Sequence, residues 1–136
     1  MNHMARLGAL LAGLTIGWWG MAQAQSPGGH THEAPHGGEV VEVAKHHVEF
    51  KADSSGTIAV WLLDAQRKAA APPAGGKVTL MPDEGEQLTL PLKVDASAQR
   101  LVAQFDPKKL KAFQAVVSLP IEGKRHNFRF RYPSHR

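Results

Sequence analysis

Short segments in which apolar and polar residues alternate recur at intervals of roughly ten residues from Glu39 onward, separated by turn-forming residues. Alternation with a period of two puts the apolar side chains on one face of a β-strand. About seven or eight such strands are predicted, at 39–43, 46–51, 57–63, 77–81, 88–94, 101–105, 115–121 and 126–132. This spacing is typical of a single antiparallel β-sandwich of immunoglobulin-like type, and a barrel shares the same pattern.

Two of these segments indicate where they lie in the sheet. Residues 57–63 are apolar on both faces, which predicts a central strand. Pro91 interrupts the alternating segment 88–94 and has no N–H group to donate. This segment is therefore predicted to lie at a sheet edge or to carry a bulge.

The amino terminus has the features of a secretory signal peptide. Arg6 precedes an apolar run from Leu7 to Met21, and Ala22-Gln23-Ala24 follows as a small-x-small cleavage signal. The run of about 15 residues is shorter than the ~20 that a membrane-spanning helix needs. We therefore predict a signal peptide at 1–24, with an uncleaved anchor as the alternative. The protein is expected to be periplasmic or secreted, with no membrane span after signal cleavage.

The remaining chain divides into two parts by composition. Residues 25–38 are polar and rich in Gly, Pro and His, which predicts a flexible loop, and residues 39–136 form the predicted β-sandwich domain. The chain has no cysteine, which excludes disulfides, a thiolate metal site and a cysteine nucleophile. The formal net charge of +4 is too small to indicate a nucleic-acid partner, and export argues against one.

Side chains able to bind a metal are concentrated between His30 and Phe50. Five of the eight histidines fall in this stretch, and four glutamates are interleaved with them. Neutral imidazole and carboxylate are ligands that suit Zn²⁺, Cu²⁺ or Ni²⁺. This stretch therefore predicts a site for a divalent transition metal ion, whose identity among these three is open.

The second half of the stretch predicts a β-hairpin that turns at Ala44-Lys45, although neither residue favours positive φ. A turn at this position places Glu42 opposite His47. Because side chains alternate along a strand, His47 and Glu49 share the outer, polar face of the hairpin. The apolar face consists of Val41, Val43, Val48 and Phe50, and its consistency fixes the register.

His36 is the predicted contribution of the preceding loop to this site. Gly37 and Gly38 give the backbone the freedom to fold the loop back over the hairpin. The predicted ligands are His36, His47 and Glu49, with His30 or His32 completing the set.

Each of these residues also has an interpretation that needs no metal. His47 and Glu49 would then be a solvated strand face, and His30 and His32 would belong to a disordered tail.

Three further histidines are predicted to lie outside the metal site. His46 alternates with the apolar residues at a strand end, so half-buried packing is expected. His126 lies on the apolar side of its strand, which predicts a structural role. His135 is close to the carboxy terminus and is expected to be solvated.

The segment APHGGEVVEVAKHHVEF (Ala34–Phe50) is similar to a segment found in a known group of proteins. It resembles the HGG…HxE opening of small periplasmic proteins associated with heavy-metal efflux and resistance, and is similar to amino-terminal segments of metal-efflux adaptor proteins. His36-Gly37-Gly38 matches the HGG element and His47-x-Glu49 the HxE element. The resemblance implies metal handling, with a heavy-metal efflux adaptor or transporter as a possible partner. In such relatives a glycine usually occupies the turn that Ala44-Lys45 forms here.

The sequence as a whole predicts a periplasmic protein that buffers or carries a divalent transition metal. The alternative is an interaction module without metal, whose β-sandwich docks a periplasmic partner by an edge strand or by the face of Arg129 and Arg131. No enzymatic activity is predicted. Ser118 and Ser134 lie in no nucleophile motif, and the Gly-rich stretch Ala74-Gly75-Gly76 does not match the motif of a phosphate-binding loop.

Overall fold

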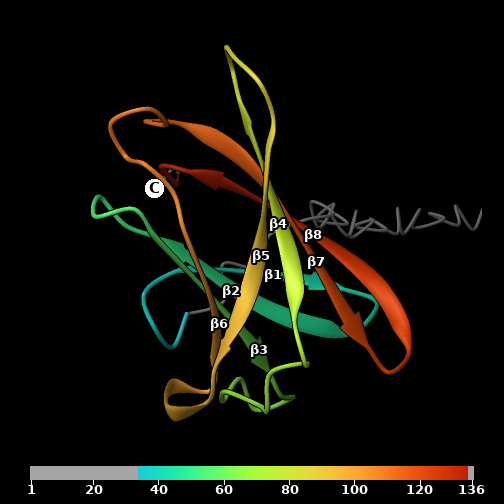
Figure 1. Cartoon of the computed structure of the whole chain (residues 1–136). Coiled ribbons are helices and arrows are strands. Elements are labelled where there is room, and N and C mark those ends of the chain that lie inside the picture. Colours follow the sequence, from blue (N-terminus) through green and yellow to red (C-terminus); the bar gives the residue numbers. More distant parts are fainter. Residues whose placement is uncertain (1–33, 135–136) are drawn as a thin grey trace, which may run out of the picture.

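The computed structural model describes residues 34–134, and these residues form an all-β domain (Figure 1). Its strands are β1 (Glu39–Val43), β2 (His46–Ala52), β3 (Thr57–Leu63), β4 (Gly76–Pro82), β5 (Leu88–Asp95), β6 (Arg100–Gln104), β7 (Phe113–Ile121) and β8 (Lys124–Tyr132). A 3₁₀ turn, Ala96–Ala98, joins β5 to β6. Each predicted alternating segment is present as a strand. Within residues 34–134 no helix is long and apolar enough to cross a membrane.

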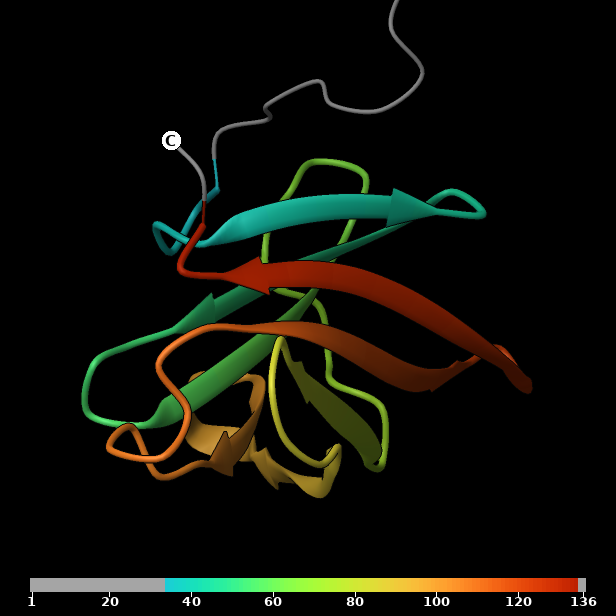
Figure 2. The same ribbon diagram turned by 90° about the horizontal axis from the view of Figure 1, so that it is seen from above.

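The strands form one antiparallel sheet in the order β1-β2-β3-β6-β5-β4-β7-β8. The first and last strands of this order, β1 and β8, lie side by side and run in opposite directions, so the sheet is nearly closed (Figure 2). The predicted all-β, antiparallel fold is confirmed. The architecture is sandwich-like, with its two halves continuous in one curled sheet.

Strand β5 is where the sheet passes from one half to the other. Residues 88–92 pair with β4, whereas residues 93–95 pair with β6. Within the described part of the chain, Pro91 thus has a ladder partner, Lys77, on one side only. A proline without an N–H group is tolerated at such a position. Strand β5 itself lies between β6 and β4, so the prediction of a sheet edge holds only for the residues around Pro91 and not for the strand as a whole.

The main core fills the space enclosed by the curled sheet. Large side chains from β2, β3, β4, β7 and β8 are fully buried there, and aromatic rings pack against one another within it. Phe50 of β2 stacks on Phe130 of β8 at a centroid distance of 4.8 Å. This pair joins the first hairpin to the last strand of the sheet.

A second, smaller apolar cluster covers the outer face of β3. Ala59, Trp61 and Leu63 are buried on this face and pack with Val40 and Ala69. The prediction that residues 57–63 form a central strand, apolar on both faces, is confirmed, since β3 lies between β2 and β6. The outer surface of the first three strands is therefore only partly exposed to solvent.

The first hairpin has the predicted register and an unfavourable turn. Glu42 lies opposite His47, and Val40 opposite Glu49. The turn residues Ala44 and Lys45 have φ values of 49° and 68°. Positive φ at both positions is typical of a type I′ turn, which matches the twist of the strands but disfavours residues other than Gly, Asn and Asp.

Candidate functional site

Glu49 lies on the outer face of β2, as its position in the strand predicts, but it is completely buried. The alternative interpretation, in which Glu49 belongs to a solvated strand face, is therefore wrong. The turn at residues 35–38 covers Glu49, and Trp61 is its register partner on β3. Strand alternation predicts which side a residue faces, but another part of the chain determines whether water reaches that side.

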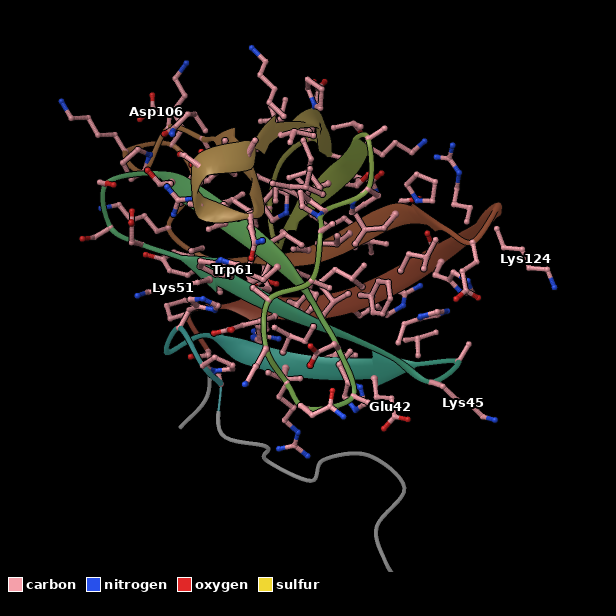
Figure 3. The ribbon with its side chains drawn as sticks, turned by 90° about the horizontal axis from the view of Figure 1, so that it is seen from below. Glu42, Lys45, Lys51, Trp61, Asp106 and Lys124 are labelled. Carbon is pink, nitrogen blue, oxygen red and sulfur yellow. The ribbon has the colours of Figure 1, made fainter. Side chains whose placement is uncertain are left out.

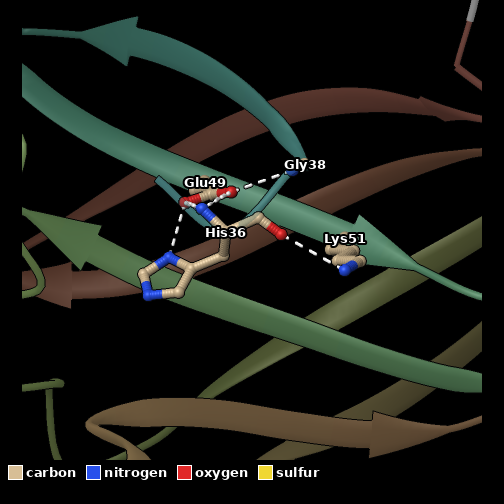
Figure 4. Close-up of polar contacts among 4 residues, drawn as sticks. All are labelled: His36, Gly38, Glu49 and Lys51. Atoms are coloured by element: carbon tan, nitrogen blue, oxygen red, sulfur yellow. Dashed lines mark hydrogen bonds and ion pairs between the residues drawn. The ribbon is translucent and has the colours of Figure 1, made fainter. Parts of the chain in front are cut away.

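Nitrogen donors of the covering turn surround the Glu49 carboxylate (Figure 4). The backbone N–H of His36 donates to Oε2 at 2.9 Å, with a longer contact of 3.2 Å to Oε1. The N–H of Gly38 donates to Oε2 at 2.9 Å. A buried carboxylate is tolerated when hydrogen-bond donors replace its lost hydration, and here the donors come from the HGG element itself.

The imidazole of His36 makes the third contact with this carboxylate. Its Nδ1 lies 2.7 Å from Oε1 of Glu49. An ionised carboxylate only accepts hydrogen bonds, so we assign the proton to Nδ1. In the neutral ring, Nε2 then carries the free lone pair, and it points away from Glu49 (Figure 4).

Stacking fixes the plane of the same ring. The His36 imidazole lies parallel to the Trp61 ring, with an interplanar angle of 3° and centroids 4.1 Å apart. Lys51 Nζ donates to the His36 carbonyl at 3.2 Å. The side chain of His36 keeps 34% exposure. It is thus held by a hydrogen bond and a stacking contact while one edge still reaches solvent.

Glycine is required at positions 37 and 38 for two different steric reasons. A Cβ on Gly38 would lie 2.4 Å from the carbonyl oxygen of Phe50, so no side chain fits there. Gly37 adopts φ +78°, which glycine tolerates best. The prediction that this pair folds His36 back over the hairpin is confirmed by its contact with Glu49.

His47 does not join His36 and Glu49. Its Nε2 lies 3.4 Å from Oε2 of Glu42, the residue opposite it on β1. Among residues 34–134, no three His, Asp or Glu side chains are grouped closely enough to hold a metal ion. His30, His32 and His135 lie outside the described residues.

His46 and His126 form a contact that the sequence did not predict. Both are half-buried, as expected for each separately, but their ring centroids are only 4.9 Å apart, with the planes tilted by 57°. The missing information was the closure of the sheet, which brings the start of β2 next to β8. The only signal in the sequence was that both residues alternate with the apolar core residues of their strands.

No protein-family model matches the chain, and no curated protein or solved structure matches it. We therefore infer function from the residues of this chain alone.

Proposed function

We propose that the protein binds a divalent transition metal ion, Zn²⁺, Cu²⁺ or Ni²⁺, with Nε2 of His36 as its preorganised ligand. The observation that carries this proposal is the 2.7 Å contact between Nδ1 of His36 and Oε1 of Glu49. Histidines that ligate metals almost always donate their second ring N–H to a carboxylate, a carbonyl or water, which orients the ring and makes it more basic. In this proposal Glu49 acts through His36 and is not itself a direct ligand.

The other ligands would come from the neighbouring histidines of the chain. His32 precedes His36 by four residues and His30 by six. At a maximum of about 3.5 Å per residue, their Cα atoms stay within about 14 Å and about 21 Å of that of His36. This tether gives their imidazoles a high effective concentration at Nε2. His47 was also predicted as a ligand, but it lies next to Glu42 and is not part of the proposed ligand set.

A site of this kind suits buffering or transfer of a metal. One ligand is held rigidly, whereas ordering a tethered segment around the ion costs conformational entropy and keeps the affinity moderate. An ion held in this way can be released to a partner. Together with the predicted signal peptide and the resemblance of Ala34–Phe50, this supports a periplasmic buffer or carrier, with a heavy-metal efflux adaptor or transporter as the receiving partner.

Equilibrium dialysis of the purified protein against Zn²⁺, Cu²⁺ and Ni²⁺ tests this proposal. His36→Gln should weaken the tightest site at least tenfold, or about 1.4 kcal/mol, because the amide cannot replace the oriented imidazole. The matched control is His135→Gln, which also removes one imidazole and should bind as the unaltered protein does. Equal affinity of the His36 variant and the control would refute His36 as the ligand.

A metal-free docking module is the second candidate. Arg125, Arg129 and Arg131 are exposed on the outer side of β8. Their register partners on β7 are Pro120, Val116 and Gln114, none of which is acidic. These arginines thus have no acidic partner on β7 and offer a basic surface to an anionic partner. Absence of binding for all three ions in the dialysis would favour this candidate.

A further inference from the structure

The two hairpins that flank the closure of the sheet end on the same side of the molecule. Lys45 marks the tip of the β1–β2 hairpin and Lys124 the tip of the β7–β8 hairpin (Figure 3). His46 follows the first tip directly, and His126 follows the second by two residues. Strand closure therefore places two imidazoles from distant parts of the sequence next to each other.

Both imidazoles face the interior side of their strands. His46 has the parity of the buried residue Val48, and His126 has that of Phe128. Each histidine is half-buried, and within residues 34–134 neither ring has a hydrogen-bond partner. Two unpaired imidazoles thus meet at one end of the space enclosed by the sheet, where solvent still has access.

The separation of the rings matches that of two ligands on one metal ion. With a metal–nitrogen bond of about 2.0–2.1 Å and a ring nitrogen about 1.1 Å from its centroid, the metal lies about 3.2 Å from each centroid. Two such rings are then about 5.2 Å apart at a tetrahedral angle and about 4.5 Å apart at a right angle. The observed 4.9 Å lies between these values.

The scaffold already holds the two rings at this distance. His46 is paired with Val43 in the first hairpin, and His126 with Leu119 in the last. The stacked pair Phe50 and Phe130 packs across the same closure. Little ordering is needed on binding, so the entropic cost is small.

We propose that His46 and His126 form a second site for a divalent transition metal ion, separate from His36, with water completing the coordination. The ion would tie the β1–β2 hairpin to β8. Because it would bind the folded chain and bridge two strands that meet at the closure, it stabilises the closed sheet by mass action. With two protein ligands, this ion exchanges readily.

Zn²⁺ titration of the full chain in a His36→Gln background tests the site independently of the proposed function. Histidine ring resonances are followed by NMR. The signals of His46 and His126 should shift together with one dissociation constant, and Zn²⁺ should raise the melting temperature. If the two rings stay unperturbed while Zn²⁺ shifts other histidines, the second site does not exist.

Single replacements test whether the two rings act as a pair. In His126→Gln, the dissociation constant for Zn²⁺ that is measured from the His46 resonances should rise at least tenfold. His46→Gln should raise the dissociation constant measured from the His126 resonances in the same way. A Zn²⁺ response of either ring that survives loss of the other overturns the proposal. Circular dichroism of the metal-free variants checks folding. If either single variant fails to fold, the titration of the His36→Gln chain alone shows whether His46 and His126 bind the same Zn²⁺ ion.

Discussion

At the scale of single residues, Glu49 is the most consequential side chain of the first hairpin. It is fully buried, and all the donors that compensate its carboxylate come from His36 and Gly38. Removing a partner from a buried, charged hydrogen-bond network leaves the other groups unsatisfied and costs more than the network contributed. The same carboxylate thus holds the turn in place and orients the proposed ligand.

Glu49→Gln should lower the free energy of unfolding by about 1–3 kcal/mol, because an amide offers one acceptor oxygen where three N–H groups now converge. Urea denaturation monitored by Trp61 fluorescence measures the change. Glu42→Gln is the matched control: the Glu42 side chain is 53% exposed, and its Oε2 lies 3.4 Å from Nε2 of His47. It should change the stability by less than about 0.5 kcal/mol. Equal effects of the two replacements would contradict the role assigned to Glu49.

At the scale of elements, the two hairpin turns at the same end of the molecule differ in how well their residues accept positive φ. The β7–β8 turn has Glu122 at φ 53° and Gly123 at φ 76°, so a glycine occupies one of the two positive-φ positions. The β1–β2 turn has Ala44 and Lys45 in the corresponding conformation. Positive φ costs a residue with a Cβ roughly 1–2 kcal/mol. The apolar face, rather than the turn, must therefore maintain the register of the first hairpin.

Replacing Ala44-Lys45 with Asn-Gly should raise the free energy of unfolding by about 1 kcal/mol, because both residues accept positive φ. Thermal and urea unfolding measure the gain. Gly123→Ala is the converse control, since no atom lies within 4 Å of its added Cβ and only the backbone conformation is penalised. It should destabilise by a comparable amount. A neutral Asn-Gly variant would show that the first turn carries no strain.

At the scale of the whole molecule, side chains connect β1 and β2 to β8 where the curled sheet meets itself. Phe50 stacks on Phe130 in the core, and His46 contacts His126 at the hairpin tips. At the other end, the Glu39 carboxylate accepts a hydrogen bond from the backbone N–H of Arg131. Desolvation raises the pKa of Glu39 above its usual value, and this hydrogen bond partly opposes the shift. The partly desolvated carboxyl group of Glu39 therefore lies where β1 meets β8.

The sign of this pKa shift predicts how the closure responds to pH. A carboxyl group whose pKa is raised in the folded protein binds a proton more tightly there than in the unfolded chain. Stability is therefore lost as pH rises from the unfolded pKa through the folded one. Glu39→Gln should stabilise the protein at pH 7, by no more than about 0.5 kcal/mol because the side chain is mostly exposed. Near pH 3.5 the Glu39 carboxyl group is neutral in both the folded and the unfolded state. Variant and parent should then unfold at the same urea concentration. A stabilisation of equal size at both pH values would contradict this assignment.

The sequence by itself determined the features that depend on neighbouring residues. The alternation of apolar and polar residues predicted each strand, the register of the first hairpin and the central place of β3. The Gly37-Gly38 pair predicted that His36 folds back onto the hairpin. These features follow from the period of the strand and from backbone sterics, which act over a few residues and can be read locally.

Only the tertiary structure decided what covers each face and which distant strands meet. The outer face of β2 was predicted to be polar, but Trp61 and the turn at 35–38 bury Glu49, and His47 lies next to Glu42. The pairing of His46 with His126 depends on the curvature of the sheet over eight strands. Burial and sheet closure depend on contacts between residues far apart in the chain, so the local alternation of apolar and polar residues does not predict them.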